Sequence, residues 1–139
     1  THTNFPFSVT ITPTNSNSKI LVQVLIMGWA SGGKYDAVWG IRRAISGGSS
    51  TDIGYSADGL RQGTKYCETD TTQNYQQHCF QFWYVDTPNT TAAITYTPRI
   101  RNGYTAGSRT FYYNRDFGYY NYQSYRVGGS RMLVMEVQP

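Results

Sequence analysis

The feature that most constrains the fold is a succession of short segments with strand periodicity, separated by clusters of turn-forming residues. Apolar and polar side chains alternate over residues 5–11 and again over residues 94–101, and this period of two indicates half-buried strands. Between such segments lie stretches rich in Gly, Pro, Asn, Ser and Thr, such as residues 12–18, 46–50 and 86–91. No segment has the length and period of a long helix, so the chain predicts an all-β fold.

The number and spacing of these segments predict an antiparallel β-sandwich with jelly-roll-like connections. Gly40 is expected to form a bulge. Pro98 donates no backbone hydrogen bond, so its strand is expected at a sheet edge or at a bulge. Residues 109–114 are expected to pair back on that strand after a turn at Asn102-Gly103. Strands are predicted over residues 5–11, 19–27, 37–45, 52–55, 77–85, 92–101, 109–114 and 131–137.

The length of 139 residues predicts one domain, spanning residues 1–139. The first residue is Thr1 rather than Met, which favours a processed or truncated chain, or the end of a longer one. No apolar run approaches the roughly 20 residues that a membrane-spanning helix needs, so membrane insertion is not expected.

The net charge is +4, and the 12 basic residues are scattered along the chain. Because nucleic-acid-binding domains concentrate basic residues on one face or helix, no nucleic-acid partner is expected. Cys67 and Cys79, with only His2 and His78 as further soft ligands, do not match a four-ligand zinc spacing. A single disulfide and two free thiols both remain open. The chain is expected to hold no metal and no cofactor.

Two strands carry apolar side chains on both faces. In residues 19–27, Leu21, Leu25 and Met27 lie opposite the isoleucine and valine face, and in residues 131–137, Leu133 and Met135 lie opposite Met132 and Val134. A covering loop could shelter the second face, but large exposed apolar patches are uncommon on monomers, which favours a subunit interface. The sequence therefore predicts an interface formed by Leu21, Leu25, Met27, Leu133 and Met135.

The segment from Tyr104 to Tyr125 is dense in tyrosine, with arginine among the rings. Tyrosine offers a large rigid contact area and a polar tip, which suits recognition, although a loop folded over the core explains the composition equally well. The three tryptophans, at positions 29, 39 and 83, are expected in the core or in an interface. The predicted ligand-binding residues are Tyr104, Arg115, Tyr119, Tyr120, Tyr122 and Tyr125.

The sequence offers no catalytic constellation. Most of its eight acidic residues fall in predicted turns, where Asp is a turn former by default. His2 lies at a terminus that is expected to fray, and Glu136 is expected to face solvent or a neighbouring arginine. Residues 54–58 (GYSAD) lack the closing glycine and the helix of a nucleophile elbow. The chain is therefore expected not to be an enzyme.

Several short motifs occur in a characteristic order along nearly the whole chain. They are VTITP at residues 9–13 leading into SKILV at 18–22, WGIRR at 39–43, DTPNTT at 86–91 before ITY at 94–96, YNR at 113–115, and the final MLVMEV at 132–137. In this order they resemble a domain found at the ends of tail-fibre and related structural proteins of bacteriophages, notably marine and cyanobacterial phages. The long Tyr-rich insertion after Arg115 and the two cysteines depart from that pattern.

This resemblance implies a trimeric β-sandwich of the virion that acts without catalysis as a tail-fibre or fibre-tip module for recognition of the host surface. The expected partners are further copies of the chain, other virion proteins, and a glycan or protein of the host surface. Two alternatives stay open, namely a capsid decoration or cement protein, and a carbohydrate-binding module of a secreted enzyme.

Overall fold

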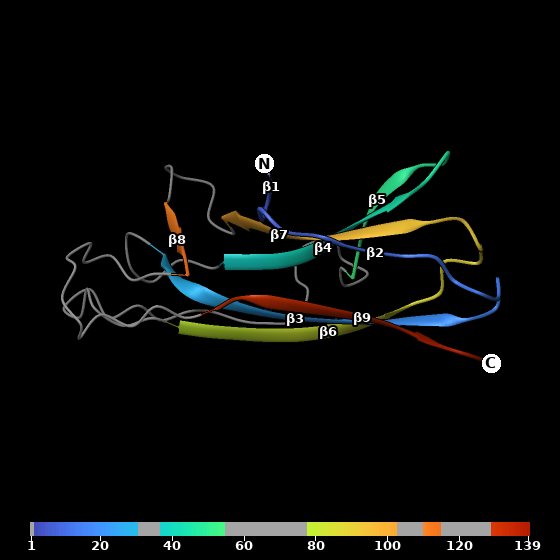
Figure 1. Cartoon of the computed structure of the whole chain (residues 1–139). Coiled ribbons are helices and arrows are strands. Elements are labelled where there is room, and N and C mark those ends of the chain that lie inside the picture. Colours follow the sequence, from blue (N-terminus) through green and yellow to red (C-terminus); the bar gives the residue numbers. More distant parts are fainter. Residues whose placement is uncertain (1, 31–36, 55–77, 103–109, 115–128) are drawn as a thin grey trace.

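The computed structural model describes residues 2–30, 37–54, 78–102, 110–114 and 129–139, and every regular element in these ranges is a β-strand (Figure 1). The strands are β1 (Thr3–Asn4), β2 (Val9–Ile11), β3 (Lys19–Ala30), β4 (Ala37–Ile45), β5 (Ser50–Ile53), β6 (His78–Asp86), β7 (Ile94–Asn102), β8 (Phe111–Tyr113) and β9 (Arg131–Val137).

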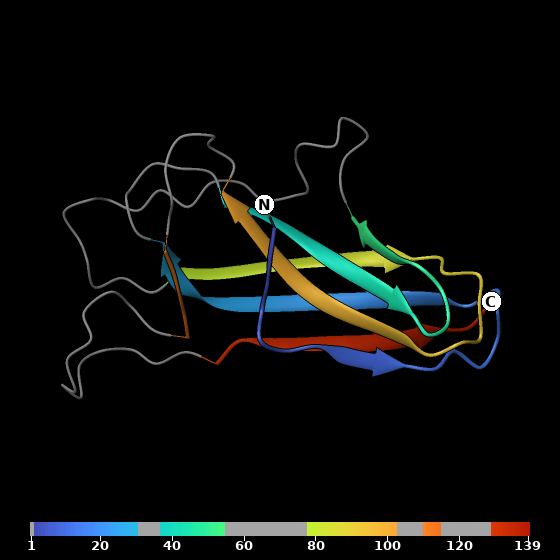
Figure 2. The ribbon, with the colours of Figure 1, turned by 90° about the horizontal axis from the view of Figure 1, so that it is seen from above.

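The strands form two antiparallel sheets that pack face to face as a β-sandwich (Figures 1 and 2). In the first sheet, β7 lies between β4 on one side and β1 and β2 on the other, and β5 extends the sheet beyond β4. In the second sheet, β3 is central, with β6 on one side and β8 and β9 on the other. The prediction of an all-β, antiparallel sandwich is confirmed.

The core lies between the sheets and follows the strand period of two. The even-numbered residues of β3, from Ile20 to Ile26, are at most 1% exposed, and residues of β4 and β7 complete the core from the opposite sheet. Alternate residues of a strand face opposite sides of the sheet, so this pattern sends the odd-numbered residues of β3 to the outer face. The buried apolar residues are Phe5, Ile20, Val22, Val24, Ile26, Trp39, Ile41, Ile53, Phe80, Ile94 and Tyr96.

Aromatic rings close the core at one end of the sandwich. Trp39 of β4 stacks on Phe5 at a centroid distance of 5.8 Å and contacts Phe80 of β6 at 4.7 Å. Phe111 of β8 meets Trp39 edge-on at 5.5 Å. These rings come from both sheets and from the segment before β2, so they hold three parts of the chain together at this end. The expectation that Trp39 belongs to the core is confirmed.

A buried polar bridge joins the two sheets near the opposite end. Asp86, the last residue of β6, is 3% exposed. It accepts a hydrogen bond of 2.8 Å from Arg43 Nη1 of β4 and another of 2.8 Å from the Tyr96 hydroxyl of β7. A buried carboxylate needs such partners, because an unpaired charge in the interior costs several kcal/mol. Burial, and then the bond to Asp86, raises the pKa of Tyr96 far above its ordinary value.

The single strand predicted over residues 5–11 is wrong. β1 and β2 flank a non-strand stretch, and Phe5 turns into the core, where it is 6% exposed. β1 pairs Thr3 with Ile100, whereas β2 pairs Val9 with Tyr96, so the chain gains two residues relative to β7 between these strands. The alternation of residues 5–11 correctly indicated strand structure at Val9–Ile11, but burial of the Phe5 ring in the core interrupts the pairing with β7 before that point.

Pro98 explains where this interruption occurs. Its carbonyl accepts the Phe5 N–H at 2.9 Å. The carbonyl and the nitrogen of one strand residue lie on the same side of the strand, so the Pro98 nitrogen, which has no hydrogen to donate, lies on the side of β7 that faces the gap between β1 and β2. The expected irregularity is present, but β7 is flanked on both sides and is not an edge strand. The bulge expected at Gly40 is wrong, because Gly40 pairs with Arg99 within an unbroken register from Ala37 to Ile45.

One further expectation is corrected by the second sheet. Residues 111–113 do not return to β7. They pair as β8 with β3, which places the Phe111 ring against Trp39. The Glu136 side chain is partly open to solvent, as expected, and its carboxylate accepts hydrogen bonds from the Thr14 amide at 2.9 Å and the Thr14 hydroxyl at 3.0 Å. These bonds fasten the loop before β3 to the last strand.

Candidate interaction surface

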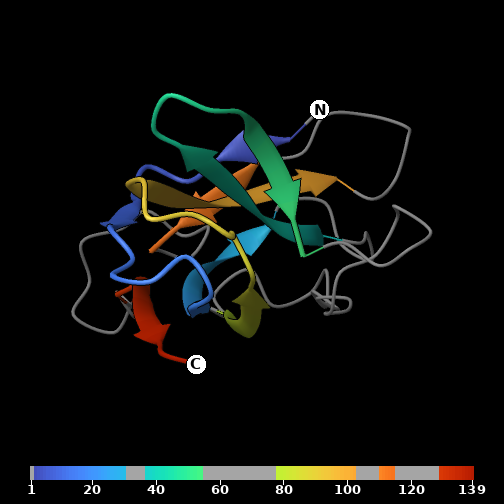
Figure 3. The same cartoon turned by 90° about the vertical axis from the view of Figure 1, so that its right-hand side faces the viewer.

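The outer face of the second sheet carries side chains in rows that run across β6, β3 and β9. The register places Val85, Leu21 and Met135 in one row and Trp83, Gln23 and Leu133 in the next. A third row holds Gln81, Leu25 and Arg131. In the view along the strands, these three strands lie side by side as the lower layer, and this face points away from the first sheet (Figure 3). We call these three rows, together with Met27 and Val137, the apolar face.

The apolar face is open to solvent. Trp83 is 68% exposed, Leu133 52%, Met135 46%, Val137 44% and Val85 41%, and these are the large hydrophobic residues that stand out as exposed in the described part of the chain. The central Leu21, Leu25 and Met27 are half-buried between their neighbours. Exposed apolar side chains are ordinary when scattered, whereas a contiguous exposed apolar patch is typical of an interaction surface.

All five residues predicted as a subunit interface lie on this face: Leu21, Leu25, Met27, Leu133 and Met135. Sequence reasoning placed Trp83 in the core or in an interface without assigning it to this face, and it did not include Val85. The sequence does indicate which side chains share the outer face of this strand. In residues 77–85, the rings of Phe80, Phe82 and Tyr84 alternate with Gln81, Trp83 and Val85. What the sequence could not supply was the pairing of β6 with β3, which places Trp83 in the same row as Gln23 and Leu133.

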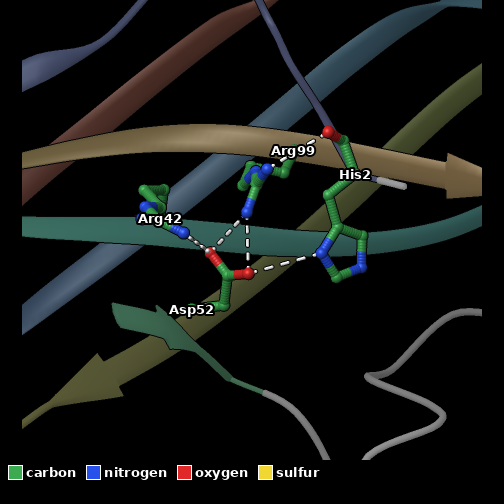
Figure 4. Close-up of polar contacts among 4 residues, drawn as sticks. All are labelled: His2, Arg42, Asp52 and Arg99. Carbon is green, nitrogen blue, oxygen red and sulfur yellow. Dashed lines mark hydrogen bonds and ion pairs between the residues drawn. The ribbon is translucent and has the colours of Figure 1, made fainter. Parts of the chain in front are cut away.

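The outer face of the first sheet is charged instead (Figure 4). Asp52 of β5 lies among Arg42 of β4, Arg99 of β7 and His2. Arg99 Nη1 is 2.7 Å from both Asp52 carboxylate oxygens, Arg42 Nη1 is 3.1 Å from Oδ1, and His2 Nδ1 is 3.3 Å from Oδ2. Arg99 Nη2 also donates to the His2 carbonyl at 3.1 Å. His2 is therefore anchored, and the expectation that it frays is wrong.

The cluster favours the ionised form of its carboxyl group. Burial raises the pKa of Asp52, but the hydrogen bonds and positive charges of Arg99 and Arg42 outweigh this effect and hold the pKa below its ordinary value of 3.8. Because both arginines already satisfy Asp52, the cluster fastens β4, β5, β7 and the N-terminal segment to one another. It has the arrangement of a structural network rather than of an acid–base pair.

The predicted ligand-binding residues Tyr104, Arg115, Tyr119, Tyr120, Tyr122 and Tyr125 lie outside the described residues, as does Cys67. The described strand ends that border them, which are the end of β7, both ends of β8 and the start of β9, lie toward the same end of the sandwich (Figure 2). Cys79 is a free, exposed thiol near this end.

One described junction joins Asn114 to Ser130, the two residues on either side of the stretch between β8 and β9. Asn114 adopts a left-handed backbone with φ of 58°. Its Oδ1 accepts hydrogen bonds from the Ser130 amide at 2.8 Å and the Ser130 hydroxyl at 2.6 Å. The Met27 amide donates to Ser130 Oγ, and the Asn114 amide donates to the Met27 carbonyl. We call this junction of Asn114, Ser130 and Met27 the clamp.

Within the described ranges, no three His, Cys, Asp or Glu side chains gather in a way that could hold a metal ion. The same part of the chain contains no helix that is long and apolar enough to span a membrane. Comparison of the chain with protein-family models, with curated proteins and with solved structures finds no match.

Proposed function

We propose that the chain is a non-enzymatic structural module of a phage particle, a jelly-roll-like sandwich that assembles with copies of itself as a trimer at a tail fibre or fibre tip. The observation that carries the proposal is the apolar face, where Trp83, Leu133 and Met135 are each more than two-fifths exposed on the outer side of the second sheet. The resemblance to tail-fibre domains supports the virion location, and the repeated passage of the chain between the two sheets supports the jelly-roll-like description.

The two outer faces support an assembly with a defined inside and outside. Ion pairs among Asp52, Arg42 and Arg99 suit the outer face of the first sheet to water. The apolar face of the second sheet is suited to removal from water, and burial of apolar area is the main driving force of most association. Copies that meet through the second sheet present the first sheet outward. The Tyr-rich segment predicted from the sequence would then contact the host surface.

Light scattering on the purified chain at micromolar concentration tests the assembly, and a mass three times that of the chain is expected. A mass equal to one chain would remove the assembly from the proposal.

Immunogold labelling of intact phage particles tests the location, with gold expected at the fibre end. Label on the head shell would favour a decoration protein instead.

Host recognition is tested by competition. Added chain should reduce phage adsorption to host cells, and the triple variant Tyr119→Ala, Tyr120→Ala, Tyr122→Ala should compete more weakly. A variant that competes as well as the parent chain would assign recognition to another part of the particle.

A further inference from the structure

The strands β6 and β9, which border the apolar face, run in the same direction. Both pair antiparallel with β3, one on each side. The register also sets them level, since Val85 and Met135 both lie opposite Leu21, and Trp83 and Leu133 both lie opposite Gln23. A residue on β6 and its counterpart on β9 are thus at the same height along the strands.

β6 is an unprotected edge among the strands that the structure describes. It is nine residues long and pairs only with β3 there. Its outward side chains, Cys79, Gln81, Trp83 and Val85, carry no charge, and no proline interrupts it. Proteins usually guard an edge with lysine, proline, a bulge or a short strand. β5, the edge of the first sheet, is guarded in this way, because it has four residues and carries Asp52.

Charge is distributed on the apolar face as in a protein interface. The two central rows, from Val85 to Met135 and from Trp83 to Leu133, contain no charged residue. The basic Lys19 and Arg131 lie beyond these rows at opposite ends of the face. An uncharged centre with charges at the rim is typical of an interface between proteins.

Resting on the assembly proposed above, we propose that three copies form a three-sided tube in which β6 of each copy lies parallel to β9 of the next and the apolar faces point inward. Rotation about a three-fold axis along the strands preserves height. Because β6 and β9 are level and run in the same direction, Val85 would meet Met135 of the next copy, and Trp83 would meet Leu133 of the next copy.

The width of the sheet favours three copies over four. Strands are spaced about 4.8 Å apart, so a side made of β6, β3 and β9 is roughly 14 Å wide. A three-sided tube of this width places each sheet roughly 4 Å from the axis, close to half of the about 10 Å that separates packed sheets. A four-sided tube places each sheet roughly 7 Å from the axis, which leaves the centre unfilled.

Engineered disulfides test this arrangement in the full chain carrying Cys67→Ser and Cys79→Ser. Val85→Cys with Met135→Cys should form covalent trimers under mild oxidation, visible on a non-reducing gel. Within one chain β3 separates the two positions by roughly 10 Å. A disulfide requires Cα atoms within about 7 Å, so the bond must join two copies. Both native side chains are more than two-fifths exposed, so neither substitution disturbs the core.

The matched control is Gln81→Cys with Met135→Cys, which moves one thiol four residues, or roughly 13 Å, along β6. The level pair should give at least about ten-fold more cross-linked product than this offset pair.

A parent chain that is trimeric but in which the level pair stays uncross-linked would overturn the arrangement and leave the proposed function standing. Cross-linking that stops at dimers would overturn the three-fold ring. A monomeric parent chain would overturn the assembly itself.

Discussion

At the scale of single residues, the polar groups of this sandwich matter most where they join strands that lie far apart in the sequence. Asp86 holds Arg43 and Tyr96 across the core, and Asp52 holds Arg42, Arg99 and the His2 segment on the surface. Each carboxylate has at least two donors, so loss of the carboxylate leaves several groups unsatisfied, and loss of one donor leaves the carboxylate short of a hydrogen bond. The expected cost therefore exceeds that of an isolated surface ion pair.

Tyr96→Phe should destabilise the fold by about 1.5–3 kcal/mol, because a buried carboxylate loses one of its two hydrogen bonds. Urea unfolding at neutral pH measures this difference. Tyr84→Phe is the matched control, since Tyr84 is a half-buried tyrosine on β6 whose hydroxyl has no hydrogen-bond partner among the described residues. An equal loss in both variants would show that the Asp86 bond contributes nothing specific.

Asp52→Asn should destabilise the fold by about 1–2 kcal/mol at neutral pH, because two arginines lose their carboxylate partner. Since the folded state lowers the pKa of Asp52, its contribution is complete above the ordinary value of 3.8 and disappears as the pH falls through the lower folded value. Urea unfolding of both proteins should give a gap at neutral pH that narrows once the pH falls below 3.8 and closes in stronger acid. A gap that persists in acid would contradict this account.

At the scale of elements, β8 depends on a close approach that only glycine allows. A Cβ at Gly28 would lie 2.4 Å from the Tyr112 carbonyl oxygen and 2.6 Å from the Phe111 ring. The backbone of β8 and the ring that packs on Trp39 would both have to move. Gly28 therefore couples the pairing of β8 with β3 to the aromatic end of the core.

Gly28→Ala should destabilise the fold by about 1–3 kcal/mol, the usual cost of overpacking. Gly129→Ala, where a Cβ meets nothing within 4 Å, should change stability by less than about 0.5 kcal/mol. Urea unfolding followed by tryptophan fluorescence compares the two. Similar stability of both variants would mean that β8 is only loosely held on β3.

Elements also show how far the sequence predicts the fold. β3, β4 and β9 follow from local composition, because each is a run of mostly apolar residues between turn-forming segments, although β3 continues past the predicted end at Met27 to Ala30. The places where prediction failed depend on contacts between distant residues. Phe5 leaves its strand for the core, and β8 joins β3 rather than β7, since the Phe111 ring finds its partners in Trp39 and Phe80. No local pattern encodes these choices.

At the scale of the whole molecule, the sandwich has one charged outer face and one apolar outer face. The sequence predicted the apolar character of β3 and β9, but the extent of the face depends on the order of strands, which joins β6 to them. The predicted ligand-binding tyrosines lie outside the described residues and stay a prediction. The described structure therefore supports the proposed contact between copies of the chain, whereas the proposed contact with the host rests on the sequence alone.

Leu133→Arg should convert the proposed trimer to a folded monomer, because it places a charge in the uncharged centre of the apolar face. Ser50→Arg, at an exposed position of the first sheet, should stay trimeric. Light scattering gives the mass, and circular dichroism checks that both variants keep their β-sheet signal. A trimeric Leu133→Arg variant would direct the search for an interface to another surface.

The clamp has a consequence for how this protein can change over generations. Asn114 and Ser130 bind each other directly and bind β3 through Met27, so the two ends of the intervening stretch are held by atoms outside it. Doubling the length of a closed segment costs only about 0.6 kcal/mol. Insertions, deletions and exchanges between these two anchors are thus inexpensive for the scaffold, so the stretch between them can vary while the sandwich is inherited unchanged.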